Sequence, residues 1–193
     1  MLKRLYDWVM ALSAHRNAVW ALAAVSFIES SVFPIPPDVL LIPMVLAARS
    51  KAWRIALVCT VSSVVGGMLG YAIGFYAFEA LGKPLLELYG YVDKFAEFRA
   101  TYNEWGAWAV FIAGITPFPY KVITIVSGLT ALDIWIFVVA SILARGLRFY
   151  IVAGLLWWYG EPIRVFIEKR LGLLTVLFCV LLVGGFVVLK YVL

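Results

Sequence analysis

Five charged residues lie inside apolar stretches of this chain, where they could bind an ion or move a proton. Two are acids and three are bases: Glu29, Asp38, Lys121, Arg145 and Arg148. A charge at the centre of a bilayer costs roughly 2.5 to 3.5 kcal/mol on insertion scales, so such residues need a partner or a wet cavity. The sequence therefore predicts a polar path through an apolar protein.

The signs of these charges suggest a path for an anionic lipid headgroup. The three bases would attract a lipid phosphate, while Glu29 and Asp38 would bind and release protons. Burial favours the neutral form of a carboxylic acid and a nearby cation favours its charged form, so a passing headgroup would change the protonation of the acids. Alternatively, the five residues are paired ions that only hold the protein together.

The composition places the chain in a membrane. Of its 193 residues, 65% are hydrophobic and 14% are charged, whereas soluble domains contain about 45 to 50% apolar residues. The net charge of +5 comes from Lys and Arg residues that lie mostly between the apolar runs. That placement suits anionic lipid headgroups and topology control. We expect membrane lipids as partners and no nucleic acid.

Residues suited to metal, nucleotide or hydrolytic chemistry are scarce in the sequence. His15 is the only histidine, and Cys59 and Cys179 stand alone in long apolar segments, so no metal or cofactor is expected. The motifs of zinc proteases, serine hydrolases and phosphate-binding loops do not occur. Glu29 and Asp38 could serve an intramembrane hydrolase as a carboxylate pair, but no nucleophile accompanies them. We expect the protein not to be an enzyme.

Prolines break two of the apolar runs, 18–48 and 105–132. An uninterrupted helix cannot pass through them, because proline lacks a backbone donor and clashes with the preceding turn. Broken backbone at membrane depth is tolerated only where protein or water covers it, so both runs are predicted to be re-entrant hairpins. The prolines taken to break the helices are Pro34, Pro36 and Pro37 in the first run and Pro117 and Pro119 in the second.

The remaining segments complete a layout of two opposed units. Residues 55–78 and 134–158 are apolar and long enough to span a bilayer, and residues 81–104 form a polar amphipathic connector. Because one span separates the two broken runs, they must enter from opposite faces, as in the inverted repeats of transporters. The predicted fold is an all-α polytopic membrane protein with two opposed re-entrant hairpins and about three transmembrane helices.

The ends of the chain and a glycine pattern add three expectations. Residues 1–16 place apolar side chains on one helical face, which is typical of an interfacial amphipathic helix, and residues 171–193 are predicted to form a C-terminal transmembrane helix. Gly66, Gly70 and Gly74 recur every four residues in the first span, a spacing that permits close helix packing. The sequence leaves open whether the chain forms a homo-oligomer.

These features resemble the DedA family of bacterial membrane proteins, which share the VTT (SNARE-associated Golgi protein) fold with eukaryotic scramblases. The resemblance covers roughly residues 17–160. Glu29-Ser-Ser and Pro-Pro-Asp38 look like the acidic first hairpin of the family, and Gly106 to Gly128 look like its second hairpin. Typical members carry two arginines in that second hairpin, whereas this chain has Lys121 alone. The difference resembles the shorter YqaA-like branch.

The resemblance implies a lipid flippase or scramblase of the bacterial inner membrane, acting on an anionic phospholipid or undecaprenyl phosphate, with or without proton coupling. Glu29, Asp38 and Lys121 match the functional acids and base of the family. The ammonium group of lysine is a point charge, whereas the guanidinium group of arginine is planar and can form two parallel hydrogen bonds. Lys121 would therefore bind a phosphate with a different geometry from the arginines of typical members. Two alternatives stay open: a proton-coupled transporter of a small solute, and a non-transporting scaffold for cell-envelope or division machinery.

The basic flanks of the first broken run predict its topology. Ser13 and Ser50 should lie on the cytoplasmic side and Thr101 outside. Single cysteines at these positions, in a background without Cys59 and Cys179, can be tested with an impermeant thiol reagent. Position 101 should react in intact cells, and positions 13 and 50 only after permeabilisation. Reaction of position 50 from outside would contradict the re-entrant hairpin.

Overall fold

The computed structural model describes residues 17–32, 36–116, 118–160 and 162, and these residues form helices joined by short turns, with no strand among them. The segments 1–16 and 171–193, predicted to be helical, lie outside the described residues. The elements in chain order are α2 (Ala18–Ser31), α3 (Asp38–Ala47), the 3-10 turn η1 (Arg49–Lys51), α4 (Ala52–Ala77), the π-helical turn η2 (Phe78–Gly82), α5 (Lys83–Tyr89), α6 (Val92–Ile115), α7 (Tyr120–Leu129) and α8 (Ile134–Tyr159).

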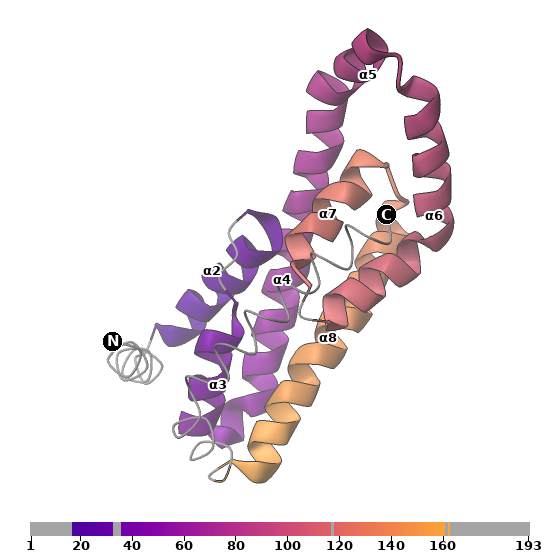
Figure 1. Cartoon of the computed structure of the whole chain (residues 1–193). Helices are drawn as coiled ribbons and strands as arrows, with labels where there is room; N and C mark the ends of the chain where they lie inside the picture. The colour runs from indigo at the N-terminus through magenta and orange to yellow at the C-terminus, as the bar shows by residue number, and fades with distance from the viewer. Residues whose placement is uncertain (1–16, 33–35, 117, 161, 163–193) are drawn as a thin grey trace.

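The all-helical fold predicted from the sequence is confirmed for the described part of the chain. Two helical stretches are apolar and long enough to cross a membrane: Arg49–Tyr89, with 41 residues, and Ile134–Tyr159, with 26 residues. A bilayer core of about 30 Å needs about 20 helical residues. The longer stretch therefore exceeds one bilayer thickness, and its far end, which includes α5, projects together with the start of α6 beyond α2, α3 and α7 (Figure 1).

Both proline-containing breaks interrupt helices. α2 ends at Ser31 and α3 begins at Asp38, while α6 ends at Ile115 and α7 begins at Tyr120. Figure 1 shows that the chain turns back at each break and that the two bends face each other near the middle of the molecule. Each broken run is therefore a hairpin of two helices.

The prolines next to the breaks start new helices. Pro37 precedes α3 with φ −65°, and Pro119 precedes α7 with φ −62°. The pyrrolidine ring fixes φ near this value, and its missing N–H costs nothing at the start of a helix. Pro36 lies in the turn before α3, while Pro34 and Pro117 lie outside the described residues.

Helix α6 continues through residues 104 and 105, where the sequence predicted that the connector ends and the second broken run begins. It runs without interruption from Val92 to Ile115, although residues 81–104 were expected to form a separate connector. No proline occurs between Val92 and Ile115, and a lone glycine such as Gly106 costs a helix only about 1 kcal/mol. The polar connector therefore consists of α5, a turn at Gly90 and the first part of α6, and α6 also supplies the first arm of the second hairpin.

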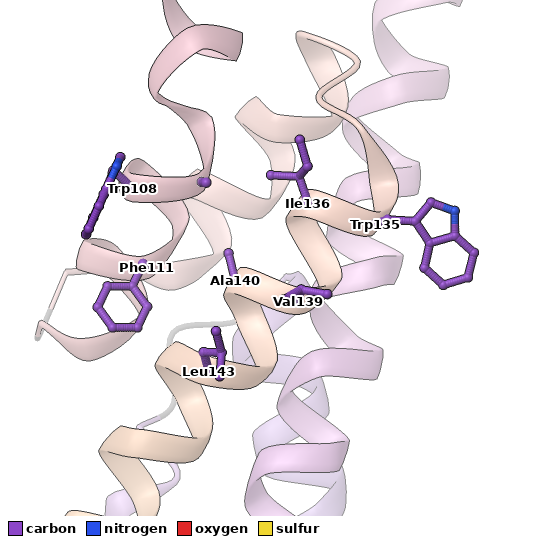
Figure 2. Close-up of a pocket in the computed structure, with 8 residues that line it drawn as sticks. Trp108, Phe111, Trp135, Ile136, Val139, Ala140 and Leu143 are labelled. Carbon is purple, nitrogen blue, oxygen red and sulfur yellow. The ribbon is translucent and has the colours of Figure 1, made fainter.

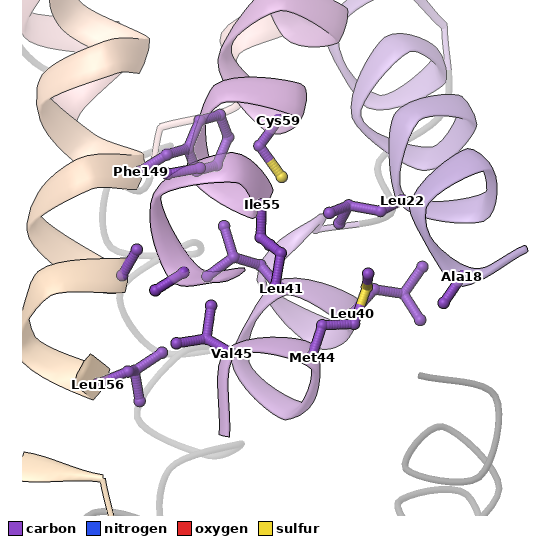
Figure 3. Close-up of a cluster of buried hydrophobic side chains, with 13 residues drawn as sticks. Ala18, Leu22, Leu40, Leu41, Met44, Val45, Ile55, Cys59, Phe149 and Leu156 are labelled. Atoms are coloured by element: carbon purple, nitrogen blue, oxygen red, sulfur yellow. The ribbon is translucent and has the colours of Figure 1, made fainter. Parts of the chain in front are cut away.

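Apolar side chains from four helices form the larger core. Leu22 of α2, Leu41 of α3, Cys59 of α4 and Phe149 of α8 are fully buried in it, and Figure 3 shows them converging between these helices. Within a bilayer, helices associate through close van der Waals packing rather than through removal of water. This core fixes the first hairpin against α4 and α8.

The glycines of α4 lie where that helix contacts both hairpins. A Cβ atom on Gly66 would clash with the backbone of Phe27 in α2, and one on Gly74 would clash with the backbone of Ile125 in α7. Gly70 lies between them and touches both of these helices. Helix α4 is therefore a common support on which both hairpins rest.

Substitution of these glycines should destabilise the protein. We expect Gly66→Ala and Gly74→Ala each to cost about 1 to 3 kcal/mol, because backbone atoms must move to admit a methyl group. The control is Gly146→Ala, whose Cβ would lie at an ordinary 3.7 Å from the Thr60 side chain and should be neutral or stabilising. Thermal unfolding in detergent measures all three. Equal melting temperatures would contradict the close packing of α4.

Candidate functional site

The buried charges meet where the first hairpin packs against α8. Glu29 Oε2 lies 2.9 Å from Arg145 Nη2, and Asp38 Oδ2 lies 2.7 Å from Arg148 Nη2. The two arginines are three residues apart, which places them on one side of α8. Glu29 belongs to the end of α2 and Asp38 to the start of α3. Helix α8 thus holds both arms of the hairpin through separate ion pairs.

Arg145 is the more buried of the two arginines, with a side chain only 1% exposed. Its Nε donates a hydrogen bond of 2.6 Å to Ser63 Oγ on α4. Its guanidinium lies 4.8 Å from the ring centre of Tyr120 and 4.7 Å from that of Phe149, within the range of cation–π attraction. Its Nη1 has no hydrogen-bond partner among the described residues. The surroundings hold Arg145 in one position.

Serine hydroxyls extend the Glu29–Arg145 pair into a network. Ser30 Oγ lies 3.2 Å from Glu29 Oε2 and 2.7 Å from Ser63 Oγ. Ser26 Oγ donates to Cys59 Sγ at 3.3 Å. The sequence interpretation missed these serines. The signal that could have found them is the spacing of Ser26 and Ser30, which puts two hydroxyls on one face of an apolar helix.

Arg148 connects the two hairpins. Besides its pair with Asp38, it donates from Nη1 to the Thr116 carbonyl at the end of α6, at 3.1 Å. The Arg148 and Asp38 side chains are 18% and 23% exposed, so this pair is more accessible than the pair made by Arg145. Asp38 also lies in the first turn of α3, where the helix dipole favours a negative charge. Its Oδ1 is buried and has no partner among the described residues.

Lys121 forms an ion pair with neither acid, although the sequence grouped it with them. Its Nζ donates to the Val32 carbonyl at 3.1 Å, and no carboxylate pairs with it within the described part of the chain. Nearby, Thr124 Oγ1 donates to the Ser30 carbonyl at 3.1 Å. These two bonds join the start of α7 to the end of α2. Lys121 is half-buried, with its charge not neutralised by an ion pair in the described residues.

Uncharged polar side chains join the arms of the second hairpin to each other and to α8. Tyr102 of α6 and Ser127 of α7 are hydrogen-bonded at 2.9 Å. The buried Tyr120 hydroxyl donates to Ser141 of α8. None of these residues was singled out from the sequence, because a tyrosine or serine in an apolar run carries no distinct signal. The acids of the site belong to the first hairpin.

The site combines two acids with three bases. Two acid–arginine pairs stand near a lysine that has no acid partner in the described structure. No group of three or more His, Cys, Asp or Glu side chains that could hold a metal ion occurs among the described residues.

Long apolar helices, proline-broken hairpins and internally paired charges together define a class of protein, the helical membrane proteins. The VTT domain matches residues 35–157 of the chain. The chain belongs to this family, whose domain is the DedA family domain, and proteins with this domain are membrane proteins. The resemblance to the DedA family is therefore confirmed.

Two relatives extend over most of the chain. A protein of Haemophilus influenzae, named only as uncharacterized, is 39% identical over 186 residues, which cover 96% of each chain. A second uncharacterized protein, from Histophilus somni and named as an HI0703 homolog, is 35% identical over 157 residues, which cover 81% of this chain and 82% of its own. No solved structure matches the chain significantly.

The difference in burial between the two ion pairs predicts a difference in stability. Removing one partner of a buried pair costs about 3 to 5 kcal/mol, because the other charge stays buried and unpaired. We expect Glu29→Gln, which leaves Arg145 unpaired, to lower the melting temperature in detergent more than Asp38→Asn, which leaves the more exposed Arg148.

The matched control is Glu79→Gln, which breaks an exposed pair with a lysine one helical turn away. Such a pair contributes only about 0.3 to 0.5 kcal/mol. A melting temperature that falls equally for Glu29→Gln and Glu79→Gln would contradict the bracing role of the buried pair.

Proposed function

We propose that this protein is a flippase or scramblase of the bacterial inner membrane that moves an anionic phospholipid or undecaprenyl phosphate between the two leaflets. The observation that carries the proposal is the position of Arg148, which bonds to Asp38 in the first hairpin and to the Thr116 carbonyl in the second. One cation thus joins two hairpins whose bends face each other. An anion that captured this cation would loosen both hairpins at once.

In this proposal, the two hairpins are re-entrant and enter the membrane from opposite faces. Discontinuous helices arranged in this way bring helix ends and polar groups to the bilayer midplane, where transporters bind their cargo. Helices α3 and α7 both begin at the bends, so the positive ends of two helix dipoles lie there. A phosphate group would be favoured at such a place.

Lys121 would make the first contact with the lipid phosphate. Its ammonium group is bonded to a neutral backbone carbonyl, which a phosphate oxygen can replace. A hydrogen bond between two charged groups is roughly twice as strong as one between neutral groups. The exchange would therefore favour the lipid, and it would also release the bond that joins Lys121 to the end of α2.

Asp38 would supply the coupling to protons. When the headgroup pairs with Arg148, the Asp38 carboxylate loses its cation while it stays mostly buried, and burial favours the neutral acid. Release of the headgroup would return Asp38 to Arg148 and free the proton. The Glu29–Arg145 pair, which is more deeply buried, would keep the first hairpin in place during this exchange.

The test of lipid movement uses purified protein in liposomes that contain a fluorescent anionic lipid. We expect Lys121→Ala to slow exchange of this lipid between leaflets by about tenfold, a change of about 1.4 kcal/mol in the barrier. Lys83→Ala, which alters an exposed lysine of α5, is the matched control and should keep the wild-type rate. Equal exchange rates for both variants, with equal amounts of protein in the liposomes, would contradict a role for Lys121 in binding the lipid phosphate.

The test of proton coupling measures lipid exchange at several pH values. We expect Asp38→Asn to remain folded and to lose the pH dependence of exchange, because asparagine cannot take up a proton. If Asp38→Asn keeps the wild-type pH dependence of lipid exchange, Asp38 does not couple exchange to protons. If the wild-type protein moves no lipid but takes up a solute together with protons, the result would favour the alternative of a small-solute transporter. If it transports neither lipid nor solute, the result would favour the alternative of a non-transporting scaffold.

A further inference from the structure

An apolar stripe runs the length of α8 on a side that the described helices leave uncovered. Its members recur every three or four residues, and each has between 45% and 57% of its surface exposed. They are Ile136, Val139, Leu143, Leu147, Ile151 and Leu155. Trp158, which is 75% exposed, ends the stripe near the last turn of the helix. The stripe is continuous from one end of α8 to the other.

At the start of α8 the stripe opens into an apolar pocket of about 620 Å³ between α6 and α8. Trp108 and Phe111 form its wall on α6, and Ile136, Ala140 and Leu143 form its wall on α8, as Figure 2 shows. None of the lining residues carries a charge. The pocket therefore suits an apolar occupant that approaches along α8.

We infer that the occupant is the C-terminal apolar run of this same chain, residues 171–193, packed antiparallel to α8. The run has no charged residue before Lys190. As a helix it would be about 34 Å long at 1.5 Å per residue. The stripe from Ile136 to Trp158 contains as many residues as this run, so one helix would cover it from end to end.

The connection between the two helices fits this arrangement. α8 ends at Tyr159, at the opposite end of the helix from the pocket, and the charge-rich segment 161–170 follows after Gly160. Helix–helix connections in bundles need only about 2 to 8 residues, so this segment is long enough to reverse the chain. The run must then travel back along α8 toward the pocket.

The register of such a pair places an aromatic side chain at the pocket. If residue 171 lies beside Trp158, antiparallel helices bring Phe186 level with Leu143.

A lipid tail or a second copy of the chain could also cover an apolar pocket. Only the C-terminal run is tethered to the end of α8, and a short tether gives an effective concentration of about the millimolar range.

Disulfide cross-linking in native membranes tests this pairing. The full-length protein would carry Cys59→Ala, Cys179→Ala, Leu143→Cys and one further cysteine, moved along positions 182 to 190. A protease site in the 161–170 connector makes an internal cross-link visible, because the cleaved halves stay joined until reduction. We expect the strongest link at Phe186→Cys, with weaker links one helical turn away.

Two controls make every outcome informative. In the first control, Val61→Cys on α4 takes the place of Leu143→Cys. Val61 is 53% exposed but is not part of the stripe, so we expect no cross-links from this position to residues 182 to 190. Ser30→Cys with Ser63→Cys, whose hydroxyl oxygens lie 2.7 Å apart, shows that oxidation proceeds. Links between two copies of the chain would overturn the inference in favour of a dimer. No link at any position from 182 to 190 would also overturn it and leave the pocket to lipid.

Discussion

The buried guanidinium of Arg145 is the constraint on which the arrangement of the helices depends. A cation in an apolar interior is stable only if charge and hydrogen bonds compensate for its lost hydration. The compensating groups come from different helices: Glu29 from α2, Ser63 from α4 and the ring of Tyr120 from α7. Three helices must therefore converge on one side of α8. That convergence brings the first hairpin and the start of α7 together.

Two arginines one helical turn apart serve different purposes because their burial differs. Arg145 is almost completely enclosed, whereas Arg148 retains some exposure and bonds to groups from both hairpins. An enclosed ion pair is costly to separate, since either partner alone would be left without water or a counter-ion. A partly exposed pair can exchange its carboxylate for another anion at a lower cost. The proposed transport cycle depends on this difference.

The bends themselves are stabilised by side chains that bond to helix ends. A helix leaves its last carbonyls without partners, and in an apolar environment each unpaired group is expensive. Lys121 donates to Val32, Thr124 donates to Ser30, and Arg148 donates to Thr116. Each donor comes from a different hairpin or helix than its acceptor. The breaks thus leave carbonyl acceptors that α7 satisfies at the end of α2 and α8 satisfies at the end of α6.

The sequence by itself determined the helical class, the two breaks and the residues that carry charge, because apolar runs, Pro37 or Pro119, and a lone ion such as Glu29 are local features of the chain. It could not assign partners. Arg145 and Glu29 are 116 residues apart, and Arg148 and Asp38 are 110 residues apart, so their pairing depends on how α2, α3 and α8 pack. The tertiary structure also gave both acids to arginines instead of Lys121. It added serines such as Ser63 to the site, because burial and hydrogen bonding are properties of packed helices and not of any single segment.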